Sequence, residues 1–285
     1  MVCHGLTGGS HESYVRNVLS WVVKPEKEGG LRARAVVINA SHVPHWLFDF
    51  SLLGAVTLSL LQTEADSPPP VPRLCAYRLS AFSELTQIRR RYPLNLLPIL
   101  LCGTTLDLAL SLHYLRSRYP RSPLHGLGFS LGASVLSRYL GETGPSSRLS
   151  SGIAIGTPWD LPAMSITLEN HWFKSRVYSR SMGTNLLRLF FKHYDRNSGV
   201  FWDVEDSVEG LRGMRGRGVT LKGVDEWMVS KVGGPRGIGL WPFGSADEYY
   251  EWASPKTVLQ GVKRRAGFLL DLLQPELIYP GHCSR

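Results

Sequence analysis

The pentapeptide GFSLG at residues 128–132 has the residue types and the spacing that a serine nucleophile requires. A short apolar segment, residues 123–127, precedes it and predicts a buried strand. Residues 133–140 follow with apolar side chains at helical spacing, and Gly141 is the expected helix stop. The order strand, sharp turn, helix is typical of a nucleophile elbow, whose glycines permit close backbone approach and whose serine stands exposed at the sheet edge. We therefore predict that Ser130 is a catalytic nucleophile. The alternative is a turn of small residues without a chemical role.

The segment CHGLTGGS at residues 3–10 is a second stretch with residue types suited to catalysis. A His-Gly pair followed by an apolar residue and more glycines resembles the loop that supplies one oxyanion-hole amide in α/β-hydrolases. The tetrahedral intermediate of acyl transfer carries a negative oxygen, which two preorganised N–H donors stabilise. We expect the backbone amides of Leu6 and Leu131 to be these donors and His4 to be structural. Taken alone, such a glycine-rich turn is more often structural than catalytic.

The composition indicates a soluble globular protein with ample material for a core. The chain has 285 residues, of which 43% are apolar and 19% charged, and these proportions exclude a disordered chain. The four cysteines stand far apart without a C-x-x-C pair, which argues against a zinc site and favours a reducing, intracellular compartment. We expect no metal and no cofactor, and we interpret His42, His45 and Asp49 as unrelated polar residues.

The net charge of +9 bears on the partners of the chain. It is compatible with attraction to anionic lipid headgroups, so peripheral membrane association is one expectation. The basic residues are mostly scattered and no aromatic residues interleave with them, so we predict no nucleic-acid partner. The longest apolar run, residues 46–61, is shorter than the ~18 residues of a spanning helix, and the first residues do not have the pattern of a signal peptide.

The elements that would position the site alternate between strand and helix. Residues 12–23 predict an amphipathic helix, and residues 34–39 predict a buried strand after a turn. A capping box at residues 104–107 predicts the start of a helix that ends before Pro120, and residues 151–158 predict another buried strand. This alternation implies a mostly parallel sheet with helices on its faces.

Residues 40–102 interrupt this order. They have no clear amphipathic pattern, and residues 62–70 have the composition of a linker. Because connections in α/β units are usually ~2–6 residues long, we interpret the segment as an irregular insert.

Residues 162–242 have a different, helical character. We expect helices at residues 166–179, 181–193 and 203–211, followed by a glycine-rich loop at residues 213–239. A helical excursion at this point can cap an active site and bury an apolar acyl chain, at ~0.8 kcal/mol per methylene. An ordinary helical subdomain packed on the sheet is the alternative.

These segments predict three parts of the chain. Residues 1–161 form the core with its insert, residues 162–242 the helical cap, and residues 243–285 a partial return to the core. A second capping box, at residues 245–248, is expected to open a helix in this last part.

Seven segments together resemble the YheT-like, embryogenesis-associated branch of the α/β-hydrolases, which includes fungal medium-chain fatty acid ethyl ester synthase/esterases. They are residues 4–14, 36–39, 113–120, 128–142, 158–161, 178–183 and 247–250. The resemblance implies an α/β-hydrolase fold with a helical cap. It also implies a Ser-His-Asp carboxylic-ester hydrolase for lipid substrates, acylglycerols or medium-chain fatty acid esters, with Ser130 as the nucleophile and no cofactor.

The resemblance also implies an acid and a base after the cap, in turns that we do not find in the sequence. Asp271 and His282 have the right residue types but stand in an unrelated setting, so they are poor candidates. The strand expected after Arg264 and the segment expected after Asn39 are replaced by other sequence, and the chain begins at the oxyanion loop. We therefore expect the N- and C-terminal parts of the fold to be missing, with residues 40–102 and 265–285 not genuine coding sequence. The alternative function is an inactive family member that at most binds lipid.

Overall fold

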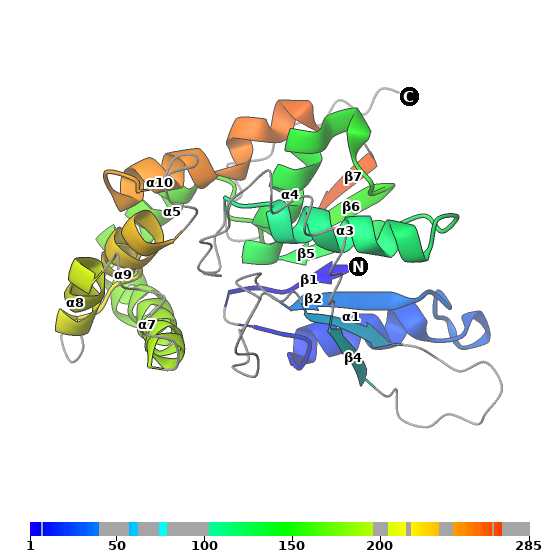
Figure 1. Cartoon of the computed structure of the whole chain (residues 1–285), viewed down its shortest axis with the longest axis horizontal. Coiled ribbons are helices and arrows are strands. Elements are labelled where there is room, and N and C mark those ends of the chain that lie inside the picture. Colours follow the sequence, from blue (N-terminus) through cyan, green and yellow to red (C-terminus); the bar gives the residue numbers. More distant parts are fainter. Residues whose placement is uncertain are drawn as a thin grey trace.

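The computed structural model places a sheet with helices on both faces beside a lobe built of helices (Figure 1). The residues that the structure describes are 1–6, 8–39, 57–61, 74–78, 103–195, 205–214, 218–233, 242–263 and 265–269. The helical elements against the sheet are α1 (Ser13–Val23), η1 (Glu26–Glu28), α3 (Leu106–Arg118), α4 (Leu131–Thr143), η2 (Gly144–Ser146) and η6 (Pro255–Gly261). Among the described residues, no helix is long and apolar enough to cross a membrane.

The sheet has seven strands in the order β4-β3-β2-β1-β5-β6-β7. The strands that run parallel to one another are β1 (Val2–Cys3), β2 (Ala35–Asn39), β5 (His125–Phe129), β6 (Ser151–Ile155) and β7 (Arg265–Leu269). The antiparallel pairs are formed by β3 (Thr57–Leu61) with β2 and by β4 (Leu74–Arg78) with β3. The predicted fold class, a mostly parallel α/β sheet flanked by helices, is confirmed.

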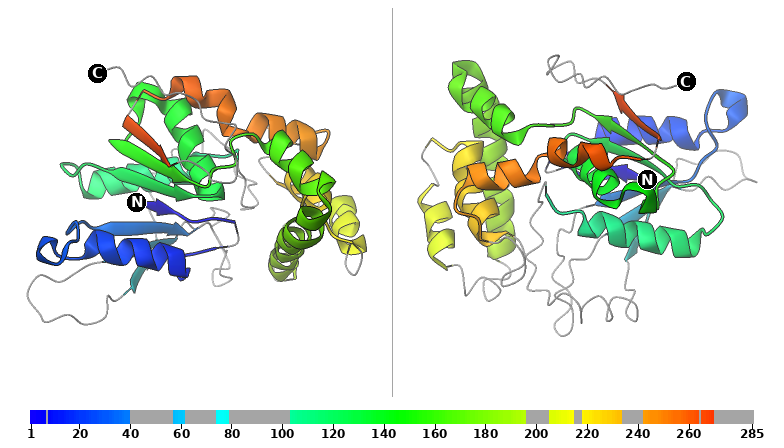
Figure 2. Two further views of the ribbon diagram at one scale, coloured as in Figure 1. Left: turned by 180° about the vertical axis from the view of Figure 1, so that it is seen from behind. Right: turned by 90° about the horizontal axis from the view of Figure 1, so that it is seen from above.

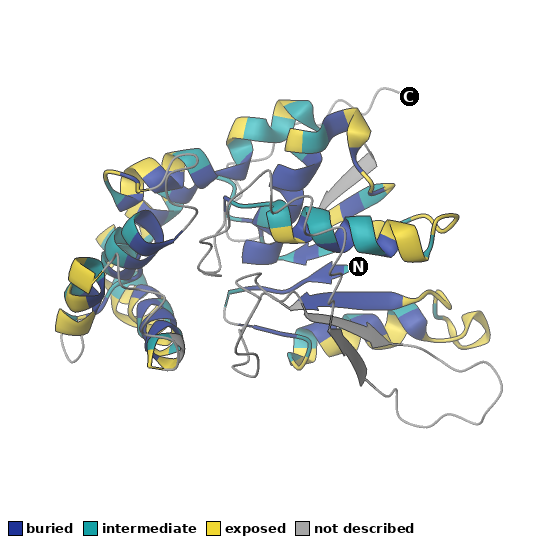
Figure 3. Cartoon of the chain, in the orientation of Figure 1, coloured by how far each residue is buried: buried dark blue, intermediate teal, exposed yellow. Residues whose placement is uncertain are grey.

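Side chains of β1 and β2 alternate between the two faces of the sheet, as the period of two in a strand requires. Val2 and Val37 pack in one cluster with the buried face of α1. Cys3 and Ile38 point to the opposite face and pack with α3 and α4. Figure 2 shows α1 on one side of the sheet and α3 and α4 on the other, and Figure 3 shows the buried residues lying between these layers.

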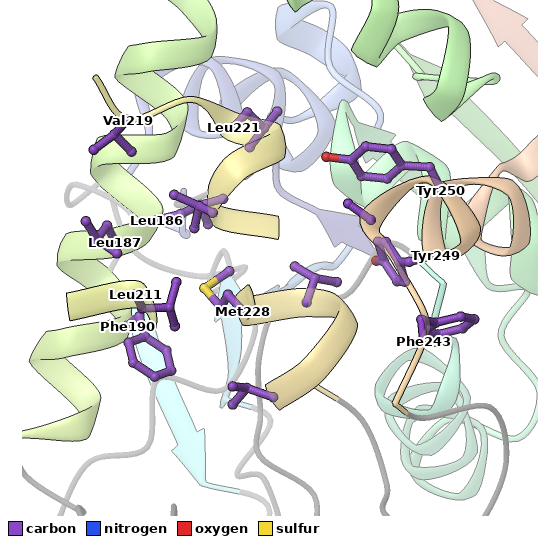
Figure 4. Packing of buried hydrophobic residues seen from close by; sticks show 14 of the residues in the cluster. Leu186, Leu187, Phe190, Leu211, Val219, Leu221, Met228, Phe243, Tyr249 and Tyr250 are labelled. Atoms are coloured by element: carbon purple, nitrogen blue, oxygen red, sulfur yellow. The ribbon is translucent and has the colours of Figure 1, made fainter. Parts of the chain in front are cut away.

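The helical lobe has a hydrophobic core of its own. Its elements are α5 (Leu161–Asn170), α6 (Trp172–Lys174), η3 (Ser175–Ser179), α7 (Arg180–Tyr194), α8 (Glu205–Gly213), α9 (Leu221–Trp227), η5 (Met228–Val232) and α10 (Ala246–Ala253). Leu186 and Phe190 of α7 point toward Leu211 of α8 and Met228 of η5 (Figure 4). This cluster of buried residues begins at Leu161 and ends at Ala253. The predicted domain boundaries at residues 161 and 242 stay predictions.

Two segments predicted to lack regular structure contribute strands. Residues 40–102, interpreted as an irregular insert, contain β3 and β4, which extend the sheet beyond β2. The strand that the sequence did not show after Arg264 is also present, because β7 (Arg265–Leu269) pairs in parallel with β6. Both predictions were wrong for the same reason: strand pairing is a nonlocal interaction, and these short segments carry a weak local pattern.

The predicted glycine-rich loop at residues 213–239 is wrong as well, since α9 and η5 lie within it. Leu221, Val224 and Met228 recur at helical spacing and are all buried in the lobe core. Thr220 caps α9, its side-chain oxygen accepting a hydrogen bond from the amide of Gly223 at 3.1 Å. The apolar spacing, not the glycine content, decides the local structure.

Two predicted helix ends also differ in the structure. Gly141 does not stop its helix, because α4 continues to Thr143. A Cβ at Gly141 would lie 2.3 Å from the carbonyl oxygen of Val258, so glycine here permits close packing on η6. The predicted capping box at residues 104–107 does not form either: Thr105 is the N-cap of α3, and its hydroxyl donates to Glu142 instead. The helix start predicted at residues 245–248 is confirmed, with Ser245 Oγ accepting from the amide of Glu248 at 3.2 Å, while the Glu248 carboxylate accepts from the amide of Gly244 rather than from that of Ser245.

Arg138 ties the elbow helix to the end of the lobe. Its guanidinium donates to the carbonyl oxygen of Trp252 at 2.6 Å and to Glu142 at 2.8 Å, and it lies 5.0 Å from the centre of the Trp252 ring. A buried guanidinium with several hydrogen bonds is strongly favoured over one left unpaired. The contact therefore holds α10 in a fixed position relative to α4.

Candidate active site

Ser130 occupies a sharp turn between β5 and α4. Its backbone has φ 50° and ψ −114°, a conformation that residues with a side chain rarely adopt. The amide of Ser130 donates to the carbonyl oxygen of Ile155 on β6 at 2.9 Å, which fixes the turn to the neighbouring strand. The side chain is exposed at the carboxyl edge of the sheet. This is the strained strand–turn–helix geometry that the sequence predicted.

Both glycines of the pentapeptide are required by close packing. A Cβ at Gly128 would lie 2.5 Å from the Cα of Ala133, inside the first turn of α4. A Cβ at Gly132 would lie 2.4 Å from the carbonyl oxygen of Cys3 and 2.5 Å from that of His4. Such distances are too short for any side chain. Glycine at 128 therefore lets the end of β5 pack on α4, and glycine at 132 lets the elbow touch the glycine-rich loop.

The glycine-rich loop lies directly beside Ser130. A Cβ placed on Gly5 would be 3.5 Å from the Cβ of Ser130. The register of the sheet brings the two together, because Cys3 pairs with Gly128 in parallel strands. The segments at residues 3–10 and 128–132, far apart in the sequence, therefore meet at one edge of the sheet.

Local hydrogen bonds hold this loop in place. The amide of Gly5 donates to the Tyr14 hydroxyl at 3.0 Å, and the Nδ1 of buried His4 donates to the carbonyl oxygen of Gly5 at 2.8 Å. The amide of Gly8 closes a turn by donating to the same carbonyl at 3.1 Å. The Tyr14 ring packs edge-on against Phe129 at 4.9 Å between centroids. Tyr14 thus braces both the loop and the elbow, a role that its place on an amphipathic helix did not reveal.

The two predicted oxyanion donors come from the two segments that meet at Ser130: Leu131 follows the serine in the chain, and Leu6 belongs to the glycine-rich loop. Leu131 is the first residue of α4, so its N–H is among the first-turn donors that have no partner inside a helix. The positive end of the helix dipole also favours a negative charge at this point. Leu6 follows Gly5 in the loop, and its half-buried side chain packs against the core of the lobe. These placements suit the predicted roles, which remain predictions.

A base for Ser130 is not found among the described residues, where the serine side chain makes no hydrogen bond. His4 uses its ring within the loop, and the ring of His125 meets Ser151 Oγ at 2.7 Å at the opposite end of β5. Asp271 and His282 lie outside the described residues, as do His42, His45 and Asp49. In the described part of the chain, no group of three His, Cys, Asp or Glu residues could hold a metal ion.

Asp160 follows the end of β6, near the same edge of the sheet, and has a structural role. Its Oδ1 accepts from the amide of Ala163 at 3.1 Å and caps α5, while Oδ2 pairs with Lys256. Desolvation raises the pKa of Asp160, but the hydrogen bonds from Lys256 and Ala163 and the charge of Lys256 outweigh it and hold the pKa below its ordinary value. The Asp160 carboxylate therefore links the end of β6 to α5 of the lobe and to Lys256 of η6.

Among the described residues of the lobe, one carboxyl group is buried. Asp225 of α9 accepts a hydrogen bond from the Tyr250 hydroxyl of α10 at 2.6 Å. Burial raises the pKa of Asp225 to about 7, against the lowering effect of the Tyr250 hydrogen bond. The contact joins two helices of the lobe core, and no local pattern in the sequence indicates it.

Comparison with known proteins identifies homologues among lipases and esterases. The chain is 27% identical to the monoacylglycerol lipase of Saccharomyces cerevisiae over 267 residues, 92% of this chain and 44% of that protein. It is 33% identical to medium-chain fatty acid ethyl ester synthase/esterase 2 of the same yeast over 84 residues, 30% of this chain and 19% of that protein. Identity to the embryogenesis-associated protein EMB8 of Picea glauca is 25% over 196 residues, 69% of this chain and 32% of that protein.

The chain thus spans less than half the length of each of these curated relatives. No protein-family model matches it, and no solved structure matches it. The predicted resemblance to this branch of the α/β-hydrolases is confirmed at modest identity.

Proposed function

We propose that this homologue of the α/β-hydrolases hydrolyses carboxylic esters of lipids with Ser130 as the nucleophile. The observation that carries the proposal is the setting of Ser130: a strained, exposed serine at the start of α4, with Gly5 alongside it. Ser130 has a rare backbone conformation and lies between two glycines that close packing requires. This conformation is unfavourable for the stability of the folded protein. Strain of this kind persists where it serves a function.

The chemistry follows from the arrangement. Ser130 Oγ attacks the ester carbonyl carbon as a base removes its proton, and the oxygen of the tetrahedral intermediate accepts hydrogen bonds from the amides of Leu6 and Leu131. Collapse of the intermediate expels the alcohol, which takes the proton from the base, and leaves an acyl-serine ester. Water then attacks this ester with the same base accepting its proton, and the fatty acid leaves. After the lobe, His282 and Asp271 have the right residue types for the base and its orienting acid, but they stand in an unrelated setting.

The lipid character of the substrate is supported by two considerations. Two of the relatives are named as a monoacylglycerol lipase and a medium-chain fatty acid ethyl ester synthase/esterase, and the substrates in these names are carboxylic esters with an apolar acyl chain. The side chain of Leu6 packs against the core of the helical lobe, which places apolar surface next to the proposed oxyanion site. Burial of an acyl chain against such a surface stabilises the bound substrate.

An inactive, at most lipid-binding protein is the second candidate function. The observation that favours it is the absence of a histidine bonded to Ser130 in the described part of the chain. Loss of a base typically lowers turnover by ~10⁶.

An activity-based probe separates the two candidates. A fluorophosphonate reacts only with an activated serine, so we expect it to label the wild-type chain and not Ser130→Ala. The labelled protein should hydrolyse monoacylglycerols or medium-chain ethyl esters, and His282→Ala and Asp271→Asn should show whether these residues support the reaction. A chain that is folded by circular dichroism but takes up no probe would establish the inactive alternative.

A further inference from the structure

We propose that the corner of the lobe formed by α5, α6 and η3 docks onto the surface of an anionic phospholipid bilayer. The apolar part of this surface, called here the aromatic corner, consists of Ile166, Trp172, Phe173, Val177 and Tyr178. The proposal goes beyond ester hydrolysis and does not require Ser130 to be catalytic.

The aromatic corner is the main exposed apolar surface of the described residues. Trp172 is 71% exposed, Ile166 61% and Tyr178 55%. The exposed fractions of Phe173 and Val177 are 49% and 44%. These five are among eight exposed large apolar side chains in the described part, and they fall within one short stretch of sequence. Several large apolar side chains exposed in one short segment indicate an interaction site, whereas single exposed side chains are ordinary.

The residue types of the corner favour a bilayer interface. Tryptophan and tyrosine combine an apolar ring with a polar tip, and both are enriched at the level of lipid headgroups. Phe173 and Tyr178 pack edge-on at 6.3 Å between ring centroids, so the two rings are held together. Little side-chain freedom is then left to lose when this pair inserts.

The charges around the corner select an anionic partner. Along the chain between Asn170 and Tyr194 every charged side chain is basic, and two of these residues, Lys174 and Arg176, belong to α6 and η3 themselves. Arg176 lies 5.8 Å from the centre of the Trp172 ring, so a cation stands directly beside the apolar surface. Glu169, the nearest acidic residue in sequence, accepts a hydrogen bond from Ser179 Oγ at 2.6 Å. A basic rim around aromatic side chains is the pattern of peripheral binding to anionic lipids.

The corner is also close to the candidate active site along the chain. α5 begins at Leu161, six residues after the end of β6, the strand whose Ile155 anchors the amide of Ser130. A bilayer bound at α5 and η3 would bring lipid to the side of the lobe that leads to the sheet edge. A second copy of this chain is a different occupant, which the test below separates.

Vesicle co-sedimentation at low ionic strength tests the proposal. We expect the wild-type chain to bind vesicles of phosphatidylcholine with about one third phosphatidylserine, to bind pure phosphatidylcholine much less, and to release in high salt. Trp172→Ala/Phe173→Ala and, separately, Lys174→Glu/Arg176→Glu should each lower the partition coefficient at least about tenfold. The matched controls are Trp21→Ala/Leu31→Ala, which removes two other exposed apolar side chains, and Arg16→Glu/Lys27→Glu, which reverses the same charge elsewhere.

The result that overturns the proposal is equal binding of wild type and both corner variants, or no binding of the wild type. Sedimentation velocity without lipid identifies the other occupant: a dimer that Trp172→Ala/Phe173→Ala dissociates would also overturn it. Probe labelling of Ser130 in the absence of vesicles is measured on the same samples. Failure of docking and failure of the proposed ester hydrolysis are therefore distinguishable.

Discussion

At the scale of single residues, Ser130 combines a reactive group with an unfavourable backbone. The tight turn needs a positive φ, but the proposed chemistry needs a hydroxyl, which glycine lacks. Strain in such a conformation costs about 1–3 kcal/mol, whereas glycine at an ordinary position costs about 0.5–1 kcal/mol relative to alanine. The serine is therefore a position where stability and function oppose each other.

We predict that Ser130→Gly is more stable than Ser130→Ala by about 1 kcal/mol in the free energy of unfolding. Both variants remove the hydroxyl, so the difference between their free energies of unfolding reports the energetic cost of the backbone conformation at position 130. Urea denaturation of the two proteins under the same conditions measures it. An alanine variant as stable as the glycine variant would mean that the turn is not strained.

At the scale of elements, the local sequence pattern predicted the helices and strands whose apolar spacing and turn residues lie within the element itself. The helix at residues 12–23, the strand at residues 34–39 and the elbow appear as expected, because apolar period and turn glycines determine them locally. The role of Gly141 inside α4 could not be predicted, because the close packing that it permits is with Val258, a residue far along the chain. α9 could have been found from the spacing of Leu221, Val224 and Met228, a signal that the many glycines of the segment obscured.

Burial of the Asp225 carboxyl group in the lobe makes the stability of the lobe depend on pH. Asp225 has a pKa of about 7 when folded, while a carboxyl in an unfolded chain has a pKa of about 3.9. Between these values the folded state holds a proton that the unfolded state has released, so stability falls as pH rises. The contribution is complete below about pH 4 and is lost above about pH 7.

We predict that Asp225→Asn weakens this pH dependence. Its amide stays neutral, and the amide oxygen can still accept from the Tyr250 hydroxyl. Between pH 5 and 8 the wild type should lose about 2 kcal/mol more than the variant in the free energy of unfolding, measured with urea at both pH values. Asp206→Asn, an exposed substitution on α8, is the control and should follow the wild type. Parallel losses in wild type and Asp225→Asn would show that Asp225 is ionised in the folded protein.

At the scale of the whole molecule, the sequence predicted the parallel sheet and the helices on its faces, but it did not predict how many strands the sheet contains. The alternation of strand and helix was enough for a parallel sheet and a helical excursion. The meeting of the glycine-rich loop with the elbow depends on the register between β1 and β5, which only the resemblance indicated. The strands β3, β4 and β7 pair at or beyond the margins of the predicted sheet, and their partners are distant in sequence. Such long-range pairing leaves little local signal.

The separate cores of sheet and lobe predict that the two parts can lose structure independently. Buried clusters on the two faces of the sheet involve α1, α3 and α4, while the lobe cluster is built from residues between Leu161 and Ala253. Phe190, 5% exposed, is central to the lobe and packs edge-on against Phe191 at 5.2 Å. Its replacement by alanine should lower the free energy of unfolding by about 3–5 kcal/mol. The lobe should then open locally before the sheet does.

Native-state hydrogen exchange measures where that loss falls. In Phe190→Ala we expect faster exchange in α7, α8 and α9, with protection of β5, β6 and α4 nearly unchanged. Leu136→Ala, which removes a fully buried side chain of α4 beneath the sheet, is the matched control and should give the reverse pattern. Arg138 donates to the carbonyl oxygen of Trp252 in α10, and Leu6 packs against the lobe core, so a small effect should cross between the two parts at these contacts. If either variant accelerated exchange equally throughout the described residues, sheet and lobe would unfold as one cooperative unit.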